Sequence, residues 1–228
     1  ITIIKSSTFN GCEKLEGVII PDDVTTIESS AFLGCKSIVK IDISENVKSI
    51  GDNAFKGCSK LKIVEIANGN ITELTVLGSN VFSDTHSSLC IIVPQDALKA
   101  YKEAANWSSY ASKIFSDNNI VNNAFLVVDG VLKQYIGNDE TVNIPANITS
   151  IGNYAFAYCV GLQTVTIGDS VTDIGDYAFY SCSALKSVTY GTDLSTIGNY
   201  AFAECVDLSQ INSSDGGVFN LNGDMLKK

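Results

Sequence analysis

The chain has 228 residues, of which 45% are hydrophobic, and its formal net charge is -10. This hydrophobic fraction is typical of a globular protein and excludes a disordered one. All 15 basic residues are lysines. An acidic chain with no arginine and no basic cluster is a poor candidate for nucleic-acid binding. No run of 18 apolar residues is present, so direct insertion of a membrane-spanning helix is not expected.

One short pattern recurs along the chain and predicts the fold. A phenylalanine is followed three residues later by a cysteine at six places, with a spacing of 23 residues within each group of three. The pairs are Phe9/Cys12, Phe32/Cys35, Phe55/Cys58, Phe156/Cys159, Phe179/Cys182 and Phe202/Cys205. A degenerate copy around Phe82 separates the groups. Leucine-rich repeats have units of roughly 20–29 residues, and stacked units share one continuous core.

Each unit contains two short apolar patterns. The first, such as Leu162 with Val165 and Ile167, alternates as a strand with one buried face requires. The second is an apolar pair such as Val171 with Ile174, after which Gly175 is expected to allow a turn. The predicted fold is therefore mainly β, a leucine-rich-repeat solenoid with two short strands per 23-residue coil.

The residue pattern of the repeat also resembles that of a known family. The stretch "IPANITSIGNYAFAYCVGLQTVTI" is similar to the BspA-type leucine-rich-repeat surface proteins of bacteria and some parasitic protists. Their repeats read roughly I-G-x-x-A-F-x-x-C-x-x-L-x-x-V-x-I-P. The pattern recurs at least five times here, although the last proline is kept only at Pro21, Pro94 and Pro145 and is replaced by Ser44, Ala67 or Gly168 elsewhere. The resemblance implies a cell-surface or secreted protein that adheres to host or microbial macromolecules.

Residues 95–115 break the period and predict a helical cap on the first block, 1–115. Apolar residues stand there at helical spacing, and Asp96 is placed to cap the helix N-terminus. We expect this segment to cover the open end of the first stack, as the end of a repeat array requires. The alternative is an aromatic ligand patch made of Tyr101, Trp107 and Tyr110.

Residues 116–123 are polar and predict a linker to the second block, 124–228. Asp129-Gly130 lies between apolar runs and predicts a hairpin that opens this block. The end of the chain, "VFNLNGDMLKK", repeats that opening, and the chain begins in the middle of a repeat. Both ends are therefore expected to be cut from a longer array, and the fragment is expected to be a monomer.

The residues offer little for catalysis or metal binding. Six of the seven cysteines share one repeat position, which predicts a ladder of buried thiols, with disulfides or a metal as the alternatives. A nucleophile needs a base, and the one histidine, His86, is expected on the solvated surface. We therefore expect neither an enzyme nor a cofactor.

The candidate ligand face is the outward side of the longer strands. In the first block these residues are Lys40, Asp42, Glu65 and an exposed Ile63, and in the second they are Thr164, Thr166, Ser187 and Thr189, followed by Gln210 and Asn212. The favoured function is a binding or adhesion module for an extracellular protein or glycoprotein, since extended repeat surfaces generally bind a partner. The alternatives are a carbohydrate-binding accessory and a structural spacer of a larger surface protein. Tyr190, the one aromatic residue in the strand pattern, is expected to point inward, which lowers the rank of sugar binding.

Overall fold

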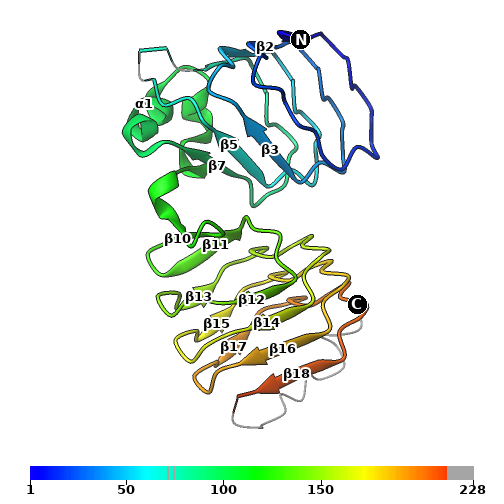
Figure 1. Ribbon diagram of the computed structural model, residues 1–228, viewed down its shortest axis with the longest axis vertical. Coiled ribbons are helices and arrows are strands. Elements are labelled where there is room, and N and C mark those ends of the chain that lie inside the picture. Colours follow the sequence, from blue (N-terminus) through cyan, green and yellow to red (C-terminus); the bar gives the residue numbers. More distant parts are fainter. Residues whose placement is uncertain (71, 74, 215–228) are drawn as a thin grey trace. The chain divides into compact units, whose positions relative to one another are not determined.

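The computed structural model describes residues 1–70, 72–73 and 75–214. The chain divides into two compact units, residues 1–118 and 119–228 (Figure 1). The division lies within the predicted linker. The predicted repeat opening at 219–226 lies outside the described residues.

The first unit winds two parallel sheets along one stack of coils. The short-strand sheet has the order β1-β2-β4-β6, with β1 Ile3–Ile4, β2 Thr26–Ile27, β4 Ser49–Ile50 and β6 Val76–Leu77. The long-strand sheet has the order β3-β5-β7-β8, with β3 Lys40–Ile43, β5 Ile63–Ile66, β7 Cys90–Val93 and β8 Ile114–Ser116. The two short strands per coil predicted from the sequence are confirmed.

The second unit repeats this plan after an antiparallel start. One sheet has the order β17-β15-β13-β11-β10-β9, with β9 Ile120–Val121, β10 Phe125–Val128, β11 Val131–Tyr135, β13 Ser150–Ile151, β15 Asp173–Ile174 and β17 Thr196–Ile197. The other has the order β12-β14-β16-β18, with β12 Thr141–Asn143, β14 Thr164–Thr166, β16 Ser187–Tyr190 and β18 Gln210–Ser213. Every pair in this second sheet is parallel and in register at a spacing of 23 residues.

Stacked phenylalanines fill the coil interiors. The ring centroid of Phe32 lies 5.0 Å from that of Phe9 and 5.1 Å from that of Phe55, and the ring planes are nearly parallel. Phe179 stacks in the same way on Phe156 and Phe202, at 4.7 and 5.1 Å. Because each ring covers the next, one repeated residue builds a continuous core in each unit.

The predicted ladder of buried thiols is confirmed at Cys35, Cys58, Cys182 and Cys205, and each of these four thiols also donates a hydrogen bond to the preceding coil. Cys58 is fully buried, and its Sγ donates a hydrogen bond of 3.2 Å to the carbonyl of Phe32 in the preceding coil. Cys182 makes the same bond to Phe156 at 3.0 Å. The thiols are free, and burial raises the pKa of Cys58 to about 12. The ladder is open to solvent at Cys12, which is exposed.

The glycines after the short strands lie where the chain turns, as predicted, because the Gly51 carbonyl accepts a hydrogen bond of 3.2 Å from the Ala54 nitrogen. They also allow close packing of the coils. Gly51 does not adopt a positive φ, but a Cβ at this position would lie 2.5 Å from the Ser29 nitrogen of the preceding coil. At Gly198 the same atom would lie 2.5 Å from the Asp176 nitrogen. The coils therefore approach too closely at these two glycines for a side chain.

The cap of the first stack is confirmed, although it is not one long helix. It consists of the 3₁₀ helix η1 Gln95–Ala97, the α-helix α1 Leu98–Glu103 and the 3₁₀ helix η2 Trp107–Lys113. Trp107 is buried, and its Nε1 donates to the Thr75 carbonyl at 2.7 Å. The buried Tyr101 hydroxyl donates to the Asn68 carbonyl at 3.0 Å. Asp96 lies inside the first turn and makes no side-chain cap, because the chain enters η1 directly from Pro94.

The predicted linker has regular structure, and the predicted hairpin is confirmed. Between the units the chain forms η3 Asp117–Asn119 and then β9, which pairs antiparallel with β10. Strands β10 and β11 pair antiparallel across Asp129 and Gly130, whose φ angles are 51° and 77°. The left-handed conformation of both residues is the one that a two-residue hairpin turn requires.

Candidate ligand-binding face

The predicted residues of the first unit lie on the outward side of β3 and β5, where their charges neutralise one another. Lys40 Nζ lies 3.2 Å from Asp42 and 3.0 Å from Glu65. Burial alone would lower the pKa of Lys40, but the two carboxylates outweigh it and raise that pKa. This wall therefore carries an internal ion-pair network, with little unpaired charge to offer a ligand.

The prediction that the Ile63 side chain is exposed is wrong. It is aligned with Lys40 on one side and Cys90 on the other, and only 3% of it is exposed. It points away from the coil interior, because it is not part of the hydrophobic core cluster of this unit. Alternation along a strand predicts which side a residue faces, but not whether that side is covered.

The predicted residues of the second unit form two aligned rows on one sheet. Thr164 and Ser187 face each other across β14 and β16, and Thr166 and Thr189 form the neighbouring pair. Thr166 is exposed and the other three are half-buried. All four carry neutral hydroxyl groups. The predicted residues, including Gln210 and Asn212 on β18, thus belong to two different sheets, one in each unit.

The first pair of residues in these rows, on β12, was not predicted from the sequence. Strand β12 aligns Thr141 with Thr164 and Asn143 with Thr166. The hydroxyls of Thr141 and Thr164 are hydrogen-bonded at 2.9 Å. The signal was present in "TVNIP", which matches the strand and proline of the repeat. We call the outward side chains of β12, β14, β16 and β18 the hydroxyl wall: Thr141, Asn143, Thr164, Thr166, Ser187, Thr189 and Asn212.

A row of tyrosines on another side of the second unit was also missed. Tyr177 stacks between Tyr154 and Tyr200, at 5.0 and 5.1 Å. Tyr180 packs its edge against Tyr177, and Tyr158 against Tyr180. Both faces of the Tyr177 ring are therefore covered by its neighbours and offer no flat platform for a sugar. Tyr190 points inward, as predicted, and is 6% exposed.

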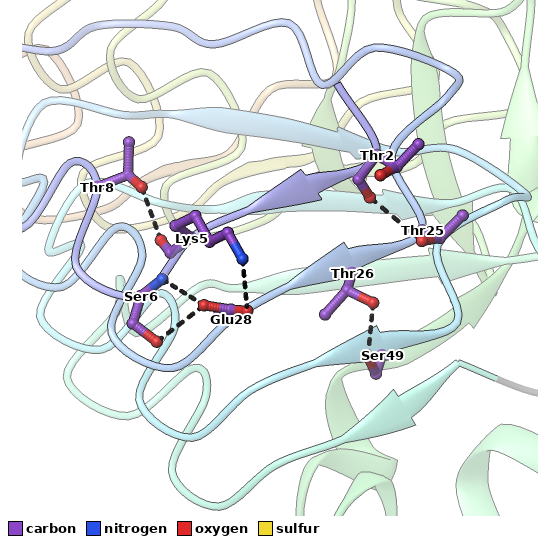
Figure 2. A network of polar contacts seen from close by, with 8 residues as sticks. All are labelled: Thr2, Lys5, Ser6, Thr8, Thr25, Thr26, Glu28 and Ser49. Carbon is purple, nitrogen blue, oxygen red and sulfur yellow. Dashed lines mark hydrogen bonds and ion pairs between the residues drawn. The ribbon is translucent and has the colours of Figure 1, made fainter.

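The short-strand side of the first unit carries polar bonds between its own coils (Figure 2). Glu28 accepts hydrogen bonds from the Ser6 nitrogen at 2.8 Å and the Ser6 hydroxyl at 3.1 Å. The Ser6 N–H is the main reason why the pKa of Glu28 lies below its ordinary value. Ser49 donates to Thr26 at 3.4 Å. These side chains have partners within the stack, so we assign them a structural role.

The prediction that His86 is solvated is wrong. The ring is partly buried, and its Nδ1 accepts a hydrogen bond of 3.2 Å from the Ser88 nitrogen and lies 2.8 Å from the Ser88 hydroxyl. Burial first, and then the charges of Lys62 and Lys113, lower the pKa of His86 to about 4. Such an imidazole is a weak base at neutral pH and a poor activator of the Ser88 hydroxyl. The pair is a local turn contact.

The described ranges contain neither a metal-ligand cluster nor a helix able to span a membrane. No group of three or more His, Cys, Asp or Glu side chains is placed there to hold a metal ion. The helices in the same ranges include none with the length and apolar character needed to cross a bilayer.

Several solved structures are similar to this chain. A protein from Eubacterium ventriosum matches with 20% identity and a TM-score of 0.43, over 84% of this chain and 60% of its own. The pneumococcal vaccine antigen PcpA matches with 16% identity and a TM-score of 0.36, over 85% and 60%. A leucine-rich cell surface protein from Faecalibacterium prausnitzii matches with 18% identity and a TM-score of 0.27, over 91% and 81%. The chain thus spans about 60% of the first two structures. A comparison with curated proteins gives no significant match.

A family comparison covers most of the sequence. Residues 1–111 and 134–226 match the BspA type leucine-rich-repeat region, in 6 copies. As far as residue 214, where the described part of the second range ends, both ranges repeat the coil of two short strands. The chain therefore belongs to the BspA-type leucine-rich-repeat family.

Proposed function

We propose that this chain is a non-catalytic binding module of a cell-surface or secreted protein, and that its ligand is an extracellular protein or glycoprotein. The family supports a repeat-based binding surface, and the resemblance noted in the sequence implies the location. Within the chain we assign the ligand face to the hydroxyl wall, and the binding unit is a monomer.

The observation that carries this assignment is the aligned rows of neutral hydrogen-bonding groups on one sheet. Thr164 aligns with Ser187, and Thr166 with Thr189 and its partner Asn212 in the next coil. Hydroxyl and amide groups both donate and accept hydrogen bonds. They also cost less to desolvate than the Lys40 network of the first unit, because removing ions from water is expensive. Identical contacts along the rows add up in avidity.

The salt dependence of the binding affinity distinguishes the neutral hydroxyl wall from the charged wall of the first unit as the ligand face. The full chain is tested by surface plasmon resonance against a panel of immobilised matrix glycoproteins at low and at physiological salt. Binding through the neutral wall is expected to be saturable and to change less than about threefold in Kd, because screening acts on charges. A loss of affinity of about tenfold or more with salt would assign binding to charged groups instead. No binding from a folded chain would favour the spacer.

A further inference from the structure

At the end of the first stack, the backbone N–H groups on one side of the last coil are only partly covered by the cap. In each coil three backbone N–H groups donate to carbonyls of the next coil, as Asn53, Phe55 and Gly57 do to Ser79, Val81 and Ser83 at 2.9–3.1 Å. The earlier coils repeat these bonds from Ser7, Phe9 and Gly11 and from Ser30, Phe32 and Gly34. In the last coil the cap supplies one replacement, because the Phe82 nitrogen donates to the Tyr110 hydroxyl at 3.2 Å. Among the described residues, no acceptor lies opposite the equivalent N–H of Asn80.

A groove lies at this edge, between the last coil and helix η2 of the cap. Its volume is about 390 Å³, within the range of roughly 300–1,000 Å³ that is typical of small-molecule sites. Ser79, Asn80 and Ser83 line it from the coil, and Asn106, Ser109 and Tyr110 line it from the cap. None of these side chains is charged, and each carries a hydroxyl or an amide.

Hydrogen bonds fix the two sides of the groove before any ligand arrives. Asn106 Nδ2 donates to the Leu77 carbonyl at 2.7 Å, and the Ser109 hydroxyl donates to the Asn106 carbonyl at 2.6 Å. The Asn106 amide therefore keeps its oxygen as an acceptor. The Tyr110 oxygen accepts the Phe82 N–H, so its proton remains to be donated. A rigid site spends less entropy on binding.

The edge offers donors without the acceptors that a peptide strand would need. The Ser79, Asn80 and Ser83 carbonyls already accept from Asn53, Ser83 and Gly57, whereas strand pairing uses N–H and C=O groups alternately. An ion would find no opposite charge among the lining side chains. A ligand rich in hydroxyls both donates and accepts, and the half-buried Tyr110 ring offers an apolar surface for its C–H groups. We propose that this groove binds a neutral saccharide of one or two rings.

The test is a binding measurement on the full chain with a set of neutral sugars. The probes are the methyl glycosides of glucose, galactose, mannose and N-acetylglucosamine, together with cellobiose and lactose. A capped tetra-alanine peptide represents the peptide alternative. Saturation-transfer NMR identifies a ligand, and titration calorimetry gives its Kd. At least one sugar is expected to bind saturably and the peptide not to bind. Binding of the peptide alone, or of no probe, would overturn the proposal.

Variants locate the site. Ser109 is exposed in the groove, so Ser109→Arg is expected to fill the space and weaken sugar binding by about tenfold or more. Ser112→Arg adds the same side chain at an exposed position of η2 outside the groove and should leave the Kd unchanged. Asn80→Gly removes the amide and tolerates the φ of 56° at this position, and it should also weaken binding.

Circular dichroism must show that each variant is folded. Equal Kd values for Ser109→Arg, Asn80→Gly and the wild type would contradict the assignment. Lysine substitutions on the hydroxyl wall of the second unit should leave sugar binding intact, so this proposal and the proposed function can fail separately.

Discussion

The residue before the Ala-Phe pair of a repeat has a left-handed backbone conformation. The two units place different residue types at this position. The first unit places Ser30 and Asn53 there, with φ angles of 57° and 56°. The second places Tyr154, Tyr177 and Tyr200, with φ between 54° and 60°. Asparagine adopts this conformation readily, whereas a large side chain does so at a cost. Stacking of the tyrosine rings, worth about 0.5–1.5 kcal/mol per pair, offsets that cost.

Substitutions of Tyr177 separate backbone strain from stacking. Tyr177→Asn and Tyr177→Ala both remove the ring contacts with Tyr154, Tyr180 and Tyr200. Asparagine relieves the left-handed strain and alanine does not, so we expect Tyr177→Asn to be more stable by about 1 kcal/mol. Urea unfolding followed by circular dichroism measures the difference. Equal stability would show that the positive φ costs nothing here.

His86 makes the first unit sensitive to acid. Its pKa is about 4 in the folded chain and roughly 6.5 when unfolded. Because the folded-state pKa is the lower one, its contribution to stability is complete above pH 6.5 and is lost as the pH falls through about 4. It is the only histidine, so the NMR titration of its Cε1 proton has one signal. A midpoint near 4 is expected, and a midpoint near 6.5 would contradict the burial of the ring.

The cap is the element on which the end of the first stack depends. Trp107 is buried, and its Nε1 donates to the Thr75 carbonyl at 2.7 Å. Trp107→Phe keeps much of the packing but leaves this carbonyl without its donor, which should cost about 1–3 kcal/mol of unfolding free energy. Urea unfolding followed by circular dichroism tests this.

A matched control is Tyr200→Phe, which removes a polar atom from a ring that is 41% exposed. It should change the unfolding free energy by less than about 0.5 kcal/mol. If Trp107→Phe were as stable as this control, the buried hydrogen bond would contribute nothing to holding the cap.

Elements that follow a strict period could be predicted from the sequence, and those set by neighbouring coils could not. The 23-residue spacing and the Asp129-Gly130 pair predicted the two strands per coil and the hairpin. The turn at Gly51 was predicted as well, but its role in close packing was not, because the approach of Ser29 from the preceding coil cannot be seen in one repeat. The left-handed φ of Tyr177, which places its ring in the stacked row, is likewise a property of the folded turn.

In the candidate sites, too, the residues that follow the repeat period could be predicted, and the features set by neighbouring coils could not. Alternation predicted five residues of the hydroxyl wall, Thr164, Thr166, Ser187, Thr189 and Asn212, because one register repeats along the sheet. The exposure of Ile63 was wrong, since periodicity does not say what covers a wall. The saccharide groove was not predicted, because it arises where the repeat ends and the Asn80 N–H loses the partner that Asn53 has in Ser79.

At the scale of the whole molecule, each unit protects one end of its own stack. The cap covers the last coil of the first unit, where Trp107 packs 6.2 Å from Phe82. The hairpin β10–β11 starts the second unit, where Tyr135 continues the ring ladder 5.0 Å from Phe156. The proposed ligand face lies away from these ends, on the long-strand sheet of the second unit.

The most direct test of the proposed ligand face is a pair of matched double variants. Thr166→Lys with Thr189→Lys places two charges on the hydroxyl wall. Thr172→Lys with Ser195→Lys adds the same charges at exposed positions beside β15 and β17, in the other sheet of the unit. Affinity for a matrix glycoprotein that binds the wild type should fall by about tenfold or more in the first variant and stay unchanged in the second. Equal affinity of both variants and the wild type would contradict the assignment of the hydroxyl wall.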